Sequence, residues 1–215
     1  MRFPLVLITF CLCLSSQTPP KEQASENKGM PPRASAADYQ AHERAGAVTI
    51  AADFAEHSIT TPQGPLSTDD YVVVEVALYA PAGTHAHISI EDFSLRINGK
   101  KSLPSQPYGM VLGNVKDPEW EPPESASTSK SKTSLNSGGS GQQPDSGPPP
   151  PVHIPIEVQH AMAQKVQKAA IPEGDRALPQ AGMIFFRYGG KPKSIHSVEL
   201  IYSGSAGKAT LTLQP

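Results

Sequence analysis

The stretch "YVVVEVALY", residues 71–79, decides the fold class of this chain. β-Branched and aromatic residues fill it almost without interruption, which is typical of a central strand that is covered on its inner face. The turn-forming "PAG" at 81–83 ends the segment. The stretch therefore predicts a sheet with these nine residues near its middle.

The segments around this stretch show the alternation of half-buried strands. Upstream, "AVTIAADF" (47–54) places apolar side chains at every second position, and downstream "ISIEDFSLRI" (88–97) does the same. Asn98 and Gly99 follow, a pair that accepts the positive φ angles of a tight hairpin turn, so "KSL" is predicted to fold back as a short partner strand. Three further strands are predicted within "GMIFFRY" (182–188), "SIHSVELIY" (194–202) and "KATLTL" (208–213).

These segments together predict a mainly β fold. Short antiparallel strands separated by turn signals are typical of a β-sandwich. The predicted sandwich covers residues 47–215 and is interrupted by an insert at 104–172. Without the insert it has about 100 residues, which is the usual size of such a domain.

Four segments also carry a family resemblance: "YVVVEVALYAPAG", "EDFSLRINGKK", "IPEGDRALPQAGMIFF" and "SVELIY". With them the chain resembles the immunoglobulin-like domain of unknown function of exported bacterial proteins and lipoproteins, which is related to a mycobacterial secreted immunoprotective antigen. The resemblance covers residues 47–103 and 171–213. It implies an immunoglobulin-like antiparallel β-sandwich, here with a long insert carrying one amphipathic helix, and it implies no catalytic residues. The long insert and the lack of a lipid-attachment cysteine depart from the family.

The N-terminus "MRFPLVLITFCLCLSSQTPP" predicts a secretory signal peptide over residues 1–17. Arg2 precedes an apolar run from Phe3 to Leu14, which is shorter than the roughly 20 apolar residues of a transmembrane helix. We therefore expect export to the periplasm or the extracellular space. The membrane is expected to be contacted only through this segment, before its cleavage or where it stays uncleaved.

The two cysteines and the segment after the signal complete this N-terminal picture. Cys11 and Cys13 both lie inside the apolar run, so the processed protein is expected to contain no thiol and no disulfide. Lipid attachment is the alternative, although Phe10 and Leu12 stand where that processing prefers a small residue. Residues 18–46, which begin with polar and proline residues, are predicted to form a disordered tether.

The insert at 104–172 is predicted to contain a flexible part and a helix. Residues 124–151 are rich in Ser, Gly and Pro and have no apolar periodicity, so nothing in them offsets the entropy of ordering. Pro155 then opens a predicted amphipathic helix over residues 156–170. Its apolar stripe repeats every four residues, at Val158, Met162, Val166 and Ala170.

A helix of this length is marginal alone in water, so its apolar stripe needs a surface to cover it. That surface is the chain's own sandwich, a groove on a partner protein or the surface of a membrane. The partner reading makes Val158, Met162 and Val166 candidate partner-binding residues. Tyr108 and Trp120 are candidates too, because aromatic residues are enriched at contact surfaces, and packing of the insert onto the sandwich is their alternative role.

His85 and His87 are the candidate metal ligands, since two residues spaced in this way point to one face of a strand. Solvated loop histidines are the alternative reading. A site would need a third ligand from His57, His196, Glu91 or Asp92.

Other chemistry is weakly indicated. "STSK" and "SKSK" match the Ser-x-x-Lys pattern of penicillin-recognising enzymes but lie in the predicted flexible tract. The acidic pairs at 69–70 and 91–92 are neighbours along the chain, which point to opposite faces of a strand. A net charge of -2 gives no reason to expect nucleic-acid binding. No enzyme activity and no cofactor are therefore expected.

The sequence as a whole predicts an exported, non-catalytic binding or accessory module of the bacterial cell envelope. An envelope or extracellular protein is the expected kind of partner. The alternatives are a metal-binding or enzymatic domain that uses His85 and His87, and a purely structural tethered domain.

Overall fold

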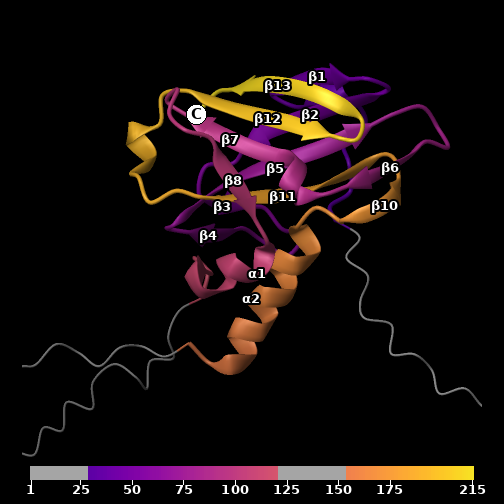
Figure 1. Ribbon diagram of the computed structural model, residues 1–215. Coiled ribbons are helices and arrows are strands. Elements are labelled where there is room, and N and C mark those ends of the chain that lie inside the picture. Colours follow the sequence, from indigo (N-terminus) through magenta and orange to yellow (C-terminus); the bar gives the residue numbers. More distant parts are fainter. Residues whose placement is uncertain (1–28, 121–153) are drawn as a thin grey trace, which may run out of the picture.

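The computed structural model describes residues 29–120 and 154–215, which form a mainly β, antiparallel structure with one long helix below it (Figure 1). The predicted signal peptide (1–17) and the predicted flexible tract (124–151) lie outside the described residues. Among the helices of the described ranges, none is long and apolar enough to cross a membrane.

Eight strands form one bent sheet in which all paired neighbours are antiparallel. Its order is β1 (Ala41–Ala45), β2 (Val48–Phe54), β5 (Tyr71–Tyr79), β11 (Gln180–Arg187), β8 (Leu103–Gln106), β7 (Phe93–Ile97), β12 (Val198–Gly204) and β13 (Gly207–Leu213). The strand β8 pairs with β11 on one side and with β7 on the other, so it joins the two halves. The predicted central strand, β5, lies between β2 and β11.

The two end strands of this sheet come close to each other, so the sheet is nearly closed into a barrel (Figure 1). A Cβ atom added at Gly46 would lie 2.4 Å from the carbonyl oxygen of Ala206, which shows how tightly the turns after β1 and β12 approach. Farther along, the side-chain amide of Gln40 donates a 2.8 Å hydrogen bond to the carbonyl of Gln214.

The main core lies between the two halves of the bent sheet. Alternate residues of β2, β5 and β11 face alternate residues of β7, β12 and β13, which is the period of two that the sequence predicts. The core includes Ile50, Val72, Val74, Val76, Phe93, Leu95, Ile184, Phe186, Leu200, Tyr202 and Leu211. The rings of Phe93 and Tyr202 meet with centroids 5.0 Å apart.

The opposite face of β5 and β11 is also covered, so β5 is buried on both faces. A second apolar cluster forms there between Val73 and Phe185 of the sheet and several smaller elements. These are β3 (Ser58–Ile59), β4 (Leu66–Thr68), β9 (Val115–Lys116), α1 (Tyr108–Val111), the 3-10 helix η3 (Leu112–Asn114) and α2 (Ile156–Ala169). The strands β3, β4 and β9 make a small antiparallel sheet of their own.

The prediction of a disordered tether over residues 18–46 is wrong for residues 29–46, which belong to the fold. Met30 donates a 2.9 Å backbone hydrogen bond to Ala181, residues 36–38 form the 3-10 helix η1, and β1 pairs with β2. Arg33 fastens this segment: its guanidinium lies 2.6 Å from Asp53 and 2.9 Å from Glu75. It also stacks 4.1 Å from the ring centroid of Tyr39.

The charge of Arg33 explains how the apolar central strand β5 accommodates a charged residue, Glu75. Burial alone would lower the pKa of Arg33, but the carboxylates of Asp53 and Glu75 outweigh that effect and raise it. The guanidinium is therefore a permanent cation beside Glu75, whose side chain is only 12% exposed. Opposite charges and hydrogen bonds together compensate the burial of both groups.

The predicted boundaries of the insert, 104–172, also differ from the structure. Residues 103–106 form β8, a paired strand of the main sheet, and 115–116 form β9. The turn before β8 is as predicted: Asn98 and Gly99 have φ angles of 53° and 66°, and the amide of Lys100 donates a 3.0 Å hydrogen bond to Ile97. Pro104 lies in the part of β8 that pairs with β7 but not with β11, and this unpaired side tolerates a residue without an amide hydrogen.

The remaining elements lie at the ends of the main sheet. A two-stranded ribbon pairs β6 (His85–Ile88) with β10 (Gly174–Ala177). Two further 3-10 helices are η2 (Ile90–Asp92), just before β7, and η5 (Pro192–Ser194), between β11 and β12.

Candidate functional site

The helix α2 is positioned first by its own ends. The carbonyl of Pro155 accepts 3.1 Å hydrogen bonds from the amides of Val158 and Gln159, which closes the first turn. The side chain of Gln159 donates a 2.8 Å hydrogen bond to the carbonyl of Ile154. At the other end Ala170 has an extended backbone with ψ 147°, so the helix stops at Ala169.

The C-terminal end of α2 is held by the main sheet. Directly after the helix, the amide of Ile171 donates a 3.1 Å hydrogen bond to the carbonyl of Met183, and Ala170 bridges Met183 in parallel. Gly182 permits this approach, because a Cβ atom there would lie 2.4 Å from the Cα of Ile171. The chain therefore crosses the face of β11 at the one strand position that carries no side chain.

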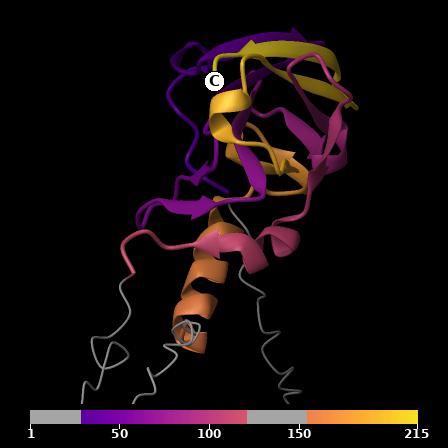
Figure 2. The same cartoon turned by 90° about the vertical axis from the view of Figure 1, so that its left-hand side faces the viewer.

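The apolar stripe of α2 packs on the chain's own sheet. Met162, Val166 and Ala169 are buried in the second cluster, and Val166 has no exposed surface. The N-terminal half of the helix extends away from the sheet, beside the segment 108–120 (Figures 1 and 2). Burial decreases along the helix in the same direction: Val158 is half-buried, and Ile156 is 61% exposed.

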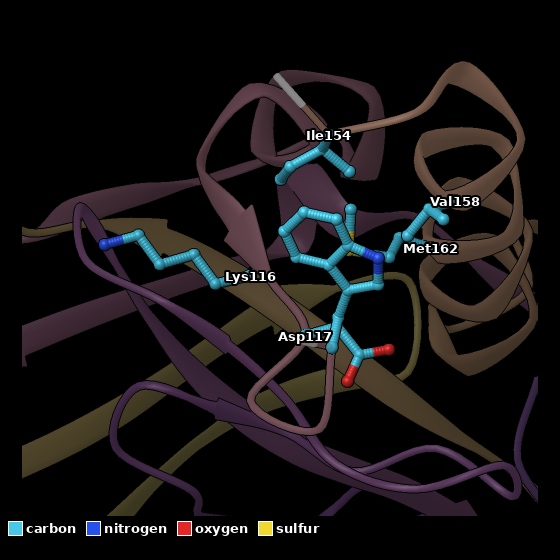
Figure 3. A pocket seen from close by; sticks show the side chains of 6 residues that line it. Lys116, Asp117, Ile154, Val158 and Met162 are labelled. Atoms are coloured by element: carbon cyan, nitrogen blue, oxygen red, sulfur yellow. The ribbon is translucent and has the colours of Figure 1, made fainter. Parts of the chain in front are cut away.

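An open hollow of about 290 Å³ lies where the exposed half of α2 faces the end of the segment 108–120. We call it the Trp120 hollow, after the only tryptophan of the chain. Its lining consists of Trp120, Ile154, Val158, Met162, Lys116 and Asp117 (Figure 3). Trp120 comes from the segment that follows β9, and Ile154 lies just before α2.

The charged groups at this hollow are already paired. Lys116 extends away from the hollow (Figure 3). Its ammonium group meets the carboxylate of Asp69. Asp117 accepts from Lys165 of α2, with the Nζ and Oδ2 atoms 3.3 Å apart. The remaining lining is aromatic or aliphatic, so the hollow offers apolar contact area with neutralised charge at its rim.

A second hollow of about 420 Å³ shares two of these residues. Ile154 and Met162 line it together with Leu112 and Val115, and the polar side chains of Gln159 and His160 also reach it. The apolar surface therefore continues past Ile154 and Met162, between α2 and the segment that holds η3 and β9.

The predicted partner-binding residues fall into three groups. Trp120, Val158 and Met162 meet at the Trp120 hollow, as a common site requires. The assignment of Val166 as a partner-binding residue is corrected, because its side chain is completely buried against its own sheet and offers a partner no surface. Tyr108 opens α1 and packs against the second cluster without lining this hollow.

The predicted metal ligands lie elsewhere, on the exposed ribbon. His85 and His87 both belong to β6, and the ring Nδ1 of His87 lies 3.0 Å from the carboxylate of Asp175 across the ribbon. Neither His57 nor His196 belongs to this ribbon. Across residues 29–120 and 154–215, no three His, Cys, Asp or Glu side chains gather as a metal site requires.

Sequence reasoning missed Ile154 and Asp117 at the hollow. Ile154 had a readable signal, because it is an apolar residue directly before the proline that opens the helix. Asp117 had none, because its partner Lys165 lies 48 residues farther along the chain and only the folded insert brings them together.

Comparisons of this chain with protein-family models, with curated proteins and with solved structures give no match.

Proposed function

We propose that this chain is an exported, non-catalytic binding module of the bacterial cell envelope, and that the Trp120 hollow receives apolar side chains of an envelope or extracellular protein. The observation that carries the proposal is an open hollow lined by Trp120, Ile154, Val158 and Met162. Export rests on the signal-like residues 1–17, and the absence of catalysis rests on the family resemblance.

The finer fold assignment belongs to the same proposal. We assign the chain to the immunoglobulin-like sandwiches, with β2, β5 and β11 in one layer and β7, β12 and β13 in the facing layer. In this assignment β8 is a strand that passes from one layer to the other, as strands do at the corners of sandwiches.

Three properties of the hollow support protein binding. Its volume of about 290 Å³ accommodates one or two large side chains, and the second hollow extends the contact along α2. Its central residues include a tryptophan, the residue type most enriched among energetic hot spots. Its two charged residues are paired within the chain, so a partner has no uncompensated charge to desolvate.

The expected energetics agree with a small, specific contact. Burial of one large apolar side chain contributes about 1.5–3 kcal/mol, so two anchors in the two hollows suffice for micromolar binding only when polar contacts surround them. Two large apolar side chains of the described residues are exposed, Met110 (59%) and Ile156 (61%), and both lie outside the two hollows.

Fluorescence of the single tryptophan tests the hollow directly. We expect the dye 1-anilinonaphthalene-8-sulfonate, an anion with apolar aromatic rings, to bind the purified chain through those rings and to take up energy from Trp120. Val158→Asp, which places a charge inside the hollow, is expected to weaken dye binding about tenfold. Ile156→Asp on the exposed side of the same helix is the matched control and is expected to leave dye affinity unchanged.

Capture from envelope extracts then tests the partner. The wild-type chain and the Ile156→Asp variant are expected to retain the same protein, and the Val158→Asp variant is expected to lose it. Equal retention by all three chains would contradict a role for the hollow in binding. A specific cleavage or transfer activity of the purified chain would contradict the non-catalytic assignment.

A further inference from the structure

A separate hollow of about 360 Å³ lies at the end of the molecule that carries η5 and β4, the side that faces the viewer in Figure 2. We call it the His57 hollow. It is formed by β4 and the turn before β3 on one side and by the loop after β11 on the other. Its lining residues are His57, Ser67, Thr68, Asp69, Gly189, Gly190, Lys191 and Pro192.

Two residues that line this hollow carry buried polar atoms without hydrogen-bond partners. Both ring nitrogens of His57 and the hydroxyl of Thr68 are buried and bond to no atom of the described chain. Thr68 is only 1% exposed. An unsatisfied buried donor or acceptor is costly, and folded proteins normally pair such groups with protein, water or ligand. The three atoms therefore indicate a polar occupant.

The position of His57 is fixed by its own backbone. The amide of Thr68 donates a 2.9 Å hydrogen bond to the carbonyl of His57, and Ser58 donates one of 2.9 Å to Ala55. The neighbouring Glu56 has a φ of 52°, which tightens the turn, and its carbonyl accepts a 2.7 Å bond from Val73. The ring is thus held between β4 and the loop after β11.

The facing loop is equally well anchored and offers further donors. Tyr188 donates a 2.8 Å backbone hydrogen bond to Asp70, and its hydroxyl lies 3.1 Å from the hydroxyl of Ser194. Gly190 packs closely there, because a Cβ atom would lie 2.4 Å from the Tyr188 ring. Within the described residues, the backbone amides of Gly189 and Gly190 donate to no protein acceptor.

The charges of the hollow favour an anion. Asp69 is its one acidic residue, and that carboxylate pairs with Lys116. Lys191 contributes an ammonium group that forms no ion pair with any described carboxylate. One positive charge therefore remains for an occupant, next to hydroxyl, imidazole and backbone donors.

We propose that the His57 hollow binds the oxyanion group of a small ligand, a phosphate, sulfate or carboxylate. Lys191 supplies the charge, and the Thr68 hydroxyl, the His57 ring and the glycine amides donate hydrogen bonds. Successive backbone amides and a cation are the usual elements of such a site, and hydrogen bonds to an ionised acceptor are stronger than neutral ones. The ion pair between Asp69 and Lys116 connects this lining to that of the Trp120 hollow, but the anion proposal does not depend on the function proposed for that hollow.

Titration of the ¹⁵N-labelled full chain with inorganic phosphate, sulfate and acetate tests the proposal. We expect saturable shifts of the Gly189 and Gly190 amide signals, and the anion that acts at the lowest concentration identifies the oxyanion class. Lys191→Ala is expected to weaken binding about tenfold. Lys193→Ala removes an equivalent charge two residues away, outside the lining, and is expected to change the affinity less than twofold.

Thr68→Val is a second test, in which stability and anion affinity are expected to change in opposite directions. It preserves shape and removes the unpartnered hydroxyl, so it is expected to raise the thermal midpoint of the ligand-free chain and to lower anion affinity. A lower midpoint with unchanged anion affinity would overturn the proposal. So would the absence of saturable shifts with all three anions, which a hollow filled only by water would give. Equal losses in Lys191→Ala and Lys193→Ala would overturn it too, because non-specific attraction to surface charge gives that result.

Discussion

The ammonium group of Lys165 on α2 lies 3.3 Å from the carboxylate of Asp117, which follows β9. The two side chains are 24% and 16% exposed, so solvent screens this pair less than the other lysine–carboxylate contact at the site, between Lys116 and Asp69. It connects the C-terminal half of α2 to the segment that carries Trp120. The pair therefore holds the two walls of the Trp120 hollow together.

Removal of either partner of this pair is expected to destabilise the chain. Lys165→Met leaves a mostly buried carboxylate unpaired, and we expect the free energy of unfolding in urea to fall by about 1–2 kcal/mol. Lys168→Met, at an exposed position one turn away, is the control and is expected to stay within about 0.5 kcal/mol. If Lys165→Met/Asp117→Leu costs as much as the two single changes added together, the two groups do not interact.

The second prediction follows from the close packing at Gly182. A Cβ atom at this position would lie 2.4 Å from Ile171 and 2.8 Å from Ala170, and both contacts are with backbone atoms that no rotamer change can relieve. We expect Gly182→Ala to cost about 1–3 kcal/mol of unfolding free energy. We also expect faster hydrogen exchange of α2 amides, because the crossing chain anchors the helix.

Gly113→Ala is the matched control for this change. Gly113 lies in η3 with open space where its Cβ atom would stand, so the variant is expected to be neutral or slightly stabilising. Unchanged exchange of α2 in Gly182→Ala would show that the helix is held mainly by Met162 and Val166.

The strands were predictable from the sequence because each reports its own environment. In β5 and β7 the spacing of apolar side chains alone gives the buried positions, and Asn98–Gly99 gives the turn that follows. The helix was predictable for the same reason, since Pro155 and the four-residue repeat are local signals.

The missed features all depend on partners distant in the sequence. In the sequence Arg33 cannot be told from the other polar residues of the predicted tether, because its partners Asp53 and Glu75 are brought beside it only by the fold. The local sequence around Thr68 and His57 does not indicate that their polar atoms lack hydrogen-bond partners, because part of their surroundings comes from the loop after β11. Near-closure of the sheet between β1 and β13 is likewise set by the bend at β8, which no local pattern encodes.

Arg33 supports the third prediction. Arg33→Met removes both ion contacts and the stacking on Tyr39, and leaves Glu75 buried without a cation. Because these groups are only partly exposed, we expect a loss of about 2–3 kcal/mol in urea unfolding, with faster exchange of amides in residues 30–40. Arg44→Met, at an exposed site on β1, is expected to change stability by less than about 0.5 kcal/mol.

Substitution by lysine separates charge from geometry at this position. Arg33→Lys keeps the charge but loses the planar fork that reaches two carboxylates and the ring, so about half of the loss is expected to remain. If the lysine variant is as stable as the wild type, the charge alone fastens the N-terminal segment.

Asp92 gives a prediction that depends on pH. Burial raises the pKa of its carboxyl group above the ordinary value, and the charge of Glu91 acts in the same direction, while His87 opposes it. A carboxyl group whose folded-state pKa is raised contributes stability below its unfolded pKa of about 4, and this contribution is lost as the pH rises through the folded value. The ionised form of Asp92 therefore destabilises the folded state at pH 7.

Asp92→Asn is accordingly expected to raise the thermal midpoint at pH 7 and to have no effect near pH 3, where the wild-type carboxyl group is already neutral in both states. Glu43→Gln, at an exposed position on β1, controls for the change in net charge and is expected to shift the midpoint little at either pH. Thermal unfolding of the three chains across this range measures the difference. If Asp92→Asn lowers the midpoint at pH 7, the carboxylate makes favourable contacts that outweigh its burial against Tyr202 and Gly204.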